Sequence, residues 1–144
     1  MTAEKSNPNR ETGTDGATAS LRGAARLLIT FGIALLANAL VGAVHLQNFL
    51  IGIVGANYFL WIVLLAVHLL ERRRLAWWLT LLGSILLTAT GLVNLTMHVL
   101  RFTAGLPVHR TIAVANFLYV LFLPLLVAKL LKKEVRAAVG VGPR

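Results

Sequence analysis

Cysteine is absent from the 144 residues of this chain, and acidic residues are scarce. Without thiols the protein cannot form disulfides, thiolate metal sites, iron–sulfur clusters or a cysteine nucleophile. The five Asp and Glu residues all lie outside the long apolar runs. No carboxylate pair, Ser–His–Asp arrangement or phosphate-binding glycine loop can be assembled from what remains. The sequence therefore shows no catalytic residues, and we do not expect an enzyme.

Charged residues are also missing from the central parts of four long apolar runs, which span residues 27–46, 49–70, 75–100 and 111–131. A helix needs about 20 residues to cross the hydrocarbon core of a bilayer. Strands of a membrane barrel alternate apolar and polar residues, and these runs do not. Because lipid offers no hydrogen-bond partner for an open backbone, each run is predicted to be a helix. The expected fold class is an all-α integral membrane protein with four transmembrane helices in an up-down bundle.

The distribution of basic residues predicts the orientation of this bundle. Twelve of the 14 Lys and Arg residues lie in the N-terminal tail, in the loop around Arg73 and at the C-terminal end, whereas Arg101 and Arg110 lie on the opposite side. Basic residues stay on the cytoplasmic side of a membrane. We expect a multi-pass protein of the cell membrane with both termini in the cytoplasm. The net charge of +9 then reflects orientation and contact with the lipid bilayer, and no nucleic-acid partner is expected.

Three domains follow from composition. Residues 1–20 are polar and lack apolar periodicity, so they are predicted to be a cytoplasmic tail that is disordered or bound to a partner. Residues 21–134 form the transmembrane domain, and residues 135–144 form a short basic cytoplasmic tail.

The second and fourth runs resemble each other. The sequence from Ala56 to Leu60 reads ANYFL, and that from Ala115 to Tyr119 reads ANFLY. Further along, the pair Leu69-Leu70 matches Leu130-Leu131 only after a slip of two residues. This pattern favours two tandem helical hairpins related by a two-fold axis along the membrane normal.

Polar residues within the apolar runs form stripes at helical spacing. Asn38 shares one face with His45 in the first run, and a longer stripe follows one face of the third run. Polar groups in hydrocarbon face the interior of a bundle, where they bond across helix contacts or line a site. The candidate membrane-interior polar stripe consists of Asn38, Ser84, Thr88 and Asn94.

Histidines are the remaining candidate ligands. His45 and His98 end the first and third runs, and His109 lies in the loop that follows. Neutral imidazole is an axial ligand for haem iron and a ligand for copper or zinc. His45 and His98 are therefore the candidate cofactor-binding pair for haem b, and all three histidines are the candidate metal site.

By elimination, the main functional expectation is a non-catalytic structural or accessory subunit of a larger membrane complex, respiratory or photosynthetic, whose partners are other membrane-protein subunits. Two alternatives remain open. One is a b-type membrane cytochrome with a bis-His site on the external side. The other is a homo-oligomeric passive channel. The aromatic side chains around Tyr58 and Tyr119 are consistent with core packing or with a bound quinone, pigment or lipid tail.

Overall fold

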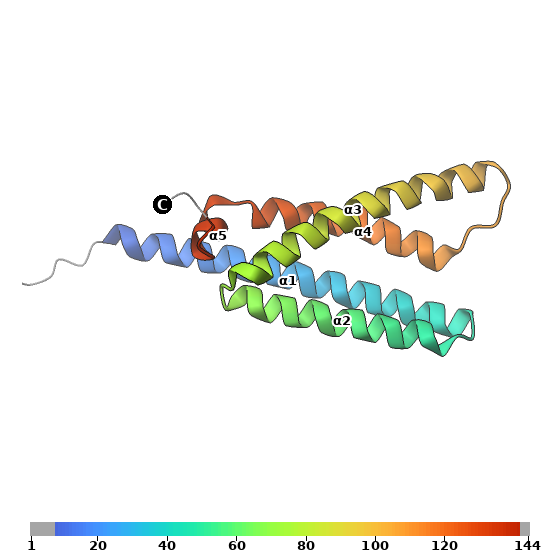
Figure 1. Cartoon of the computed structure of the whole chain (residues 1–144), viewed down its shortest axis with the longest axis horizontal. Coiled ribbons are helices and arrows are strands. Elements are labelled where there is room, and N and C mark those ends of the chain that lie inside the picture. The colour runs from blue at the N-terminus through green and yellow to red at the C-terminus, as the bar shows by residue number, and fades with distance from the viewer. Residues whose placement is uncertain (1–7, 142–144) are drawn as a thin grey trace, which may run out of the picture.

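The structure, a computed structural model, describes the backbone of residues 8–141 and the side chains of residues 16–141. This part of the chain is helical and contains no strand (Figure 1). Two long antiparallel hairpins lie against each other, and a short last helix folds back onto the first one. The helices are α1 (Pro8–His45), α2 (Phe49–Leu70), α3 (Arg74–Thr103), α4 (Arg110–Leu130) and α5 (Lys133–Ala138).

Four of these helices are long and apolar enough to cross a membrane, as the sequence predicts. The apolar stretches cover Gly16–His45, Phe49–Leu70, Arg74–Thr103 and Arg110–Leu130. Their outer faces carry large exposed side chains such as Phe49, which is 87% exposed, and Leu86, which is 68% exposed. An exposed apolar surface of this extent is typical of a surface that contacts lipid or another protein.

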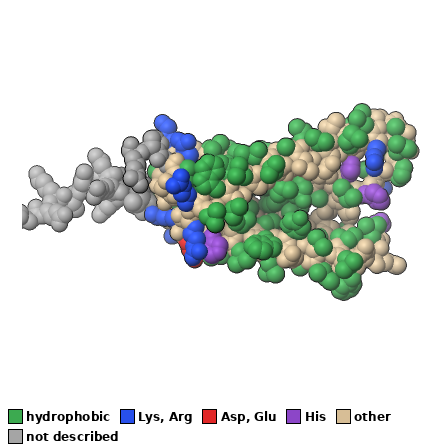
Figure 2. Space-filling view, viewed as in Figure 1, with side chains coloured by type: hydrophobic (Ala, Val, Ile, Leu, Met, Phe, Trp, Pro, Cys, Tyr) green, Lys and Arg blue, Asp and Glu red, His purple; other side chains and the backbone are tan. Residues whose placement is uncertain are grey.

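The two ends of the molecule differ in charge. At one end, here called the basic end, lie the first turns of α1, the α2–α3 turn at 71–73 and α5. Figure 2 shows Lys and Arg side chains gathered there, with apolar side chains along the length of the molecule. The opposite end, here called the loop end, contains the tight turn at 46–48 and the longer loop at 104–109.

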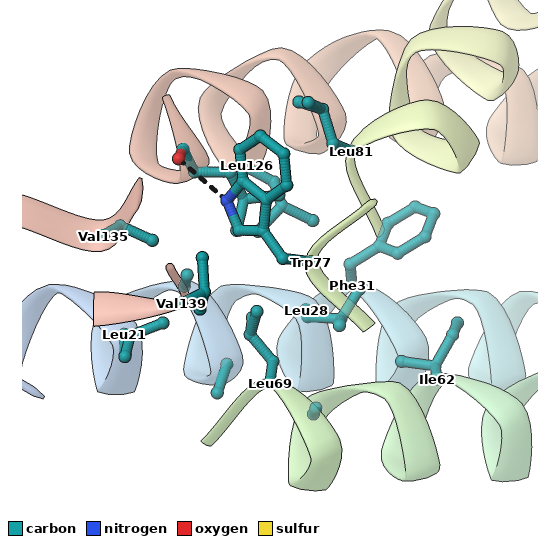
Figure 3. Close-up of a cluster of buried hydrophobic side chains, with 14 of the residues drawn as sticks. Leu21, Leu28, Phe31, Ile62, Leu69, Trp77, Leu81, Leu126, Val135 and Val139 are labelled. Atoms are coloured by element: carbon teal, nitrogen blue, oxygen red, sulfur yellow. Dashed lines mark hydrogen bonds between the residues drawn. The ribbon is translucent and has the colours of Figure 1, made fainter. Parts of the chain in front are cut away.

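The buried core lies near the basic end, where all five helices meet (Figure 3). Trp77 of α3 is only 2% exposed and packs among Leu126, Leu28 and Leu69, which come from three other helices. Its indole Nε1 donates a hydrogen bond to the backbone oxygen of Leu130 at 3.1 Å. The first turn of α3 is thereby attached to the last turn of α4.

Helix α1 begins earlier than the sequence predicts. It starts at Pro8, whereas the apolar run begins at Leu27, so part of the predicted tail is helical. Leu21 is buried against Val135 and Val139 of the α5 region, and Thr18 Oγ1 accepts a hydrogen bond from the Arg72 guanidinium at 3.0 Å. Thr18 of the predicted tail is thus held by the α2–α3 turn, whereas Leu21, at the start of the predicted transmembrane domain, packs on the α5 region. Residues 1–7 of the predicted tail, and 142–144 of the C-terminal tail, lie outside the described part.

The two hairpins diverge toward the loop end (Figure 1). Within each hairpin the helices pack along their length, α1 on α2 and α3 on α4. Between the hairpins, α1 packs extensively on α4, whereas α2 and α3 make far fewer contacts. This asymmetry leaves a cleft between the hairpins in the loop-end half of the molecule.

Candidate functional site

The cleft between the hairpins has a volume of about 600 Å³, and Figure 2 shows the surface hollowed between the two lobes at the loop end. A volume of this size is typical of sites for small organic ligands. Its walls are mainly apolar, with amide and phenol groups among them. The lining residues are Leu35, Asn38, Ala39, Leu46, Leu50, Ile51, Val54, Gly55, Tyr58, Asn94, Thr111, Ile112, Ala115, Asn116 and Tyr119.

Two asparagine side chains meet on the α3–α4 wall of the cleft. Asn94 Nδ2 donates to Asn116 Oδ1 at 3.5 Å, a long contact. Asn116 Nδ2 in turn donates to the backbone oxygen of Ile112 at 2.9 Å, one helical turn earlier. Asn116 is buried, with 3% of its surface exposed. The pair satisfies Asn116 but leaves Asn94 Oδ1 without a donor within the described part of the chain.

A third asparagine joins the two hairpins near the loop end. Asn38 Nδ2 of α1 donates to the backbone oxygen of Thr111 in the first turn of α4 at 2.9 Å. Polar side chains commonly bond across helix contacts in this way when water is excluded. The bond closes the α1–α4 side of the cleft, and the Asn38 Oδ1 oxygen accepts no hydrogen bond from the described residues.

Two tyrosines, one from each hairpin, line the cleft. Tyr58 of α2 is 61% exposed, whereas Tyr119 of α4 is half-buried. The ring of Tyr119 rests against Phe31 with 5.9 Å between the ring centroids, which fixes its orientation at the inner side of the cleft. Neither phenol hydroxyl bonds to another described residue.

Small residues permit the close approach of the helices that form each wall. A Cβ atom at Gly91 would lie 2.9 Å from Tyr119 Cβ and 3.1 Å from the backbone oxygen of Asn116. In the other hairpin, a Cβ atom at Gly55 would overlap Ala39. Each hairpin is thus held tightly together at the level of the cleft, in the manner of small-residue contacts between membrane helices.

These contacts define how the two hairpins correspond. Every residue that α2 contributes to the cleft is matched by an α4 residue 61 positions later, from Leu50 with Thr111 to Tyr58 with Tyr119. In α1 and α3 the matching register is 52 positions, because Ala24, Ala25, Leu28 and Gly32 are buried and so are Ala76, Trp77, Thr80 and Ser84. The two close helix contacts correspond to each other in both registers. Ala39 is equivalent to Gly91 in the register of 52, and Gly55 is equivalent to Asn116 in the register of 61.

This correspondence supports tandem hairpins but corrects their alignment. The similar words ANYFL and ANFLY equate Asn57 with Asn116, a separation of 59. Asn57 is exposed, whereas Asn116 is buried in the cleft, so the two are not equivalent. A separation of 61 relates α2 to α4 along their length. In the sequence this separation shows only in the match of Leu69-Leu70 with Leu130-Leu131.

The predicted polar stripe divides between the cleft and the helix contacts. Asn38 and Asn94 line the cleft. Ser84 is buried on α3 outside the cleft, with 4% of its surface exposed. Thr88 Oγ1 donates to the backbone oxygen of Ser84 at 2.7 Å, a bond within one helix. The predicted polar stripe does not include Asn116, which lies on α4. In the sequence, Asn116 stands out only as part of the similarity between the second and fourth apolar runs.

The histidines lie apart from the cleft lining. His45 is exposed at the end of α1, and His109 is exposed at the start of α4. His98 is half-buried, and its Nε2 atom is buried without a partner among the described residues. Its equivalent in the register of 52 is Leu46 and not His45. Among the described residues, no three His, Asp or Glu side chains come together to hold a metal ion. The bis-His haem site stays a prediction.

A carboxyl group with a shifted pKa, that of Glu71, lies at the basic end. Glu71 follows α2, and its Oε2 atom is 3.0 Å from His68 Nδ1 and 2.7 Å from Arg73 Nε. The hydrogen bond with His68, together with the nearby Arg73 charge, lowers the pKa of Glu71 below its usual value. This cluster shapes the α2–α3 turn and is far from the cleft along the helices.

No protein-family model, curated protein or solved structure matches this chain. Functional inference therefore depends on the chemistry of the described residues alone.

Proposed function

We propose that this protein is an integral membrane protein of the cell membrane and a non-catalytic, accessory subunit of a larger membrane complex. In this proposal α1 to α4 cross the bilayer as an up-down bundle with both termini in the cytoplasm. The basic end then faces the cytoplasm, as the distribution of Lys and Arg favours. The partners are transmembrane helices of other subunits.

The observation that supports this role most strongly is the position of Asn57. Its side chain is exposed on the outer face of α2 and makes no hydrogen bond to a described residue. It lies eight residues into α2, about 12 Å from the start of the helix, at a rise of roughly 1.5 Å per residue. That depth is inside the hydrocarbon of a bilayer. A polar amide there is costly when it faces lipid and is satisfied by bonding to a neighbouring helix.

The residues around Asn57 form a continuous apolar face. Ile53 precedes Asn57 by four residues, and Leu60 and Leu64 follow it by three and seven; they are 58%, 61% and 48% exposed. Trp61, next to Leu60, is 61% exposed. One polar group surrounded by large apolar side chains is the usual composition of a contact between membrane helices. The face points away from α1, so it is open for a partner.

Crosslinking tests this assignment directly. A photoreactive residue replaces Leu60 on the α2 face, and the matched control replaces Val93, which is 63% exposed on α3. In native membranes, the Leu60 position should crosslink to another polypeptide, and Asn57→Leu should weaken that crosslink at least severalfold. The Val93 position should give mainly lipid adducts.

The mass of the assembly in mild detergent provides the second measurement. A mass that exceeds whole multiples of this chain and contains other polypeptides supports the subunit role. A mass equal to one chain, or to a whole multiple of it, together with lipid adducts at both positions, contradicts it.

A further inference from the structure

The cleft between the hairpins has a chemical character that restricts its ligand. Of the described residues that line it, none carries a charge. An anionic or cationic group placed there would lose its hydration without gaining a counter-charge, at a high cost in free energy. A phospholipid headgroup or a metal ion is therefore a poor occupant, and a neutral molecule is a good one.

Polar groups in the cleft are nevertheless available for a ligand. Asn94 Oδ1 and Asn38 Oδ1 can accept hydrogen bonds, and the hydroxyls of Tyr58 and Tyr119 can donate them. Unpaired groups of this kind in an apolar cleft favour a ligand with matching carbonyl or hydroxyl groups. The rest of the lining is apolar and suits a hydrocarbon body.

The depth of these polar groups in the bilayer further restricts the class of ligand. Tyr58 lies nine residues after the start of α2, and Tyr119 lies nine residues after the start of α4. At roughly 1.5 Å per residue, both are about 14 Å from the loop end. Asn94 is the same number of residues from the end of α3. The polar part of the ligand must therefore sit within the hydrocarbon and not at the level of lipid headgroups.

We propose that the cleft binds a neutral, largely apolar molecule from the bilayer, whose compact head carries carbonyl or hydroxyl groups, as an isoprenoid quinone does. The head lies between Tyr58, Tyr119 and Asn94, and the apolar tail leaves the cleft between α2 and α3 into the hydrocarbon. Entry is from the α2–α3 side, because the bond from Asn38 to Thr111 closes the α1–α4 side. This proposal is independent of the subunit role.

Small molecules retained by the native protein provide the first test. The protein is extracted with its surrounding lipid in polymer nanodiscs, and the bound quinones and neutral glycerolipids are quantified by mass spectrometry. Ala115→Phe fills the cleft, whereas Val114→Phe adds a ring on the exposed side of the same helix, outside the cleft lining, and serves as the control. Retention above the bulk membrane composition is expected for wild type and Val114→Phe. Ala115→Phe should lower it about tenfold.

Direct binding is the second test, and it distinguishes a quinone from a diacylglycerol as the ligand. A short-chain isoprenoid benzoquinone and a diacylglycerol are each titrated into purified protein, and the rise in thermal midpoint is recorded. The quinone should stabilise the wild type, and Tyr119→Phe should weaken its apparent affinity about tenfold, because the Tyr119 hydroxyl is a donor available to a quinone carbonyl. Thermal midpoint and elution volume without ligand verify that each variant folds.

Three results would overturn the proposal. One is equal retention by the wild type and a folded Ala115→Phe variant. Another is enrichment of phospholipid only. The third is stabilisation by diacylglycerol but not by the quinone, which would leave a lipid site in place of the quinone-like one.

Discussion

Trp77 at the start of α3 and Leu130 at the end of α4 are joined by a buried hydrogen bond of 3.1 Å from indole to backbone carbonyl. The last carbonyls of a helix lack partners within the helix, and here a side chain from the adjacent helix supplies one. The bond holds the second hairpin closed at the basic end, while the loop end opens into the cleft.

Loss of this bond should destabilise the protein. Trp77→Phe leaves the Leu130 oxygen buried without a donor, and an unsatisfied buried acceptor costs about 1–3 kcal/mol. Thermal unfolding in detergent, followed by size-exclusion elution, should show a lower midpoint. Trp78→Phe is the control, because Trp78 is 39% exposed and its indole makes no hydrogen bond. Equal midpoints for the two variants would contradict this role of Trp77.

Two glycines of α3 should respond in opposite ways to the same substitution. A methyl group at Gly91 would approach Tyr119 Cβ to 2.9 Å, so Gly91→Ala must separate α3 from α4 and should cost about 1–3 kcal/mol. A methyl group at Gly83 meets nothing within 4 Å, so Gly83→Ala should stabilise the helix by up to about 1 kcal/mol. Thermal midpoints in detergent measure both. A neutral Gly91→Ala variant would show that the hairpin is looser than described.

The carboxyl of Glu71 should titrate below 4.5 in the folded protein, because His68 and Arg73 stabilise its charged form. Carbon NMR of the side-chain carboxyl measures this pKa. His68→Ala removes the largest contribution and should return the pKa toward 4.5, whereas Arg73→Ala should shift it less. No change in His68→Ala would contradict the hydrogen bond.

The same shift determines the sign of a pH effect on stability. A carboxyl whose pKa is lower in the folded state stabilises that state above its unfolded pKa, and the contribution disappears as the pH falls through the folded pKa. The difference in thermal midpoint between wild type and Glu71→Gln should be small at pH 7, because the group is exposed. It should decrease further as the pH falls through the folded pKa of Glu71. A difference that grows on acidification would be inconsistent with this account.

The proposed orientation can be tested in a chain that has no native thiol. Single substitutions Ala104→Cys in the loop end and Lys133→Cys at the basic end are exposed to a membrane-impermeant maleimide. In intact cells Ala104→Cys should be labelled and Lys133→Cys should not, and permeabilisation should expose both. The reverse pattern would place the termini outside the cytoplasm.

Much of the helical structure follows from the sequence, because the apolar runs end abruptly at polar residues. The predicted run 49–70 coincides with α2, and the limits of α3 and α4 differ from prediction by three residues or fewer. Helix α1 differs most: it begins at Pro8, well before the apolar run, and Leu21 inside it is buried by Val135 and Val139. Such a contact joins residues more than a hundred positions apart and leaves no local periodic signal.

The cleft was less predictable than the helices. Asn38 and Asn94 stand out as polar residues in apolar runs, and both line it. The partner of Asn94 is Asn116, which the sequence analysis includes only within the similarity of ANYFL to ANFLY. That similarity aligns Asn116 with Asn57, which lies outside the cleft. A comparison of the two hairpins by burial, which the sequence does not contain, was needed to establish the register of 61.

The register of 61 has a consequence for the orientation of a bound ligand. The backbone places equivalent positions on the two walls of the cleft, as two copies of one hairpin would. At the closest contacts, however, position 55 carries a hydrogen atom as its side chain and position 116 carries an amide. At this position the first hairpin offers no side chain and the second offers an amide, although the scaffold repeats. A molecule between them meets two different surfaces, so a ligand with unlike faces has a single preferred orientation in a nearly symmetric frame.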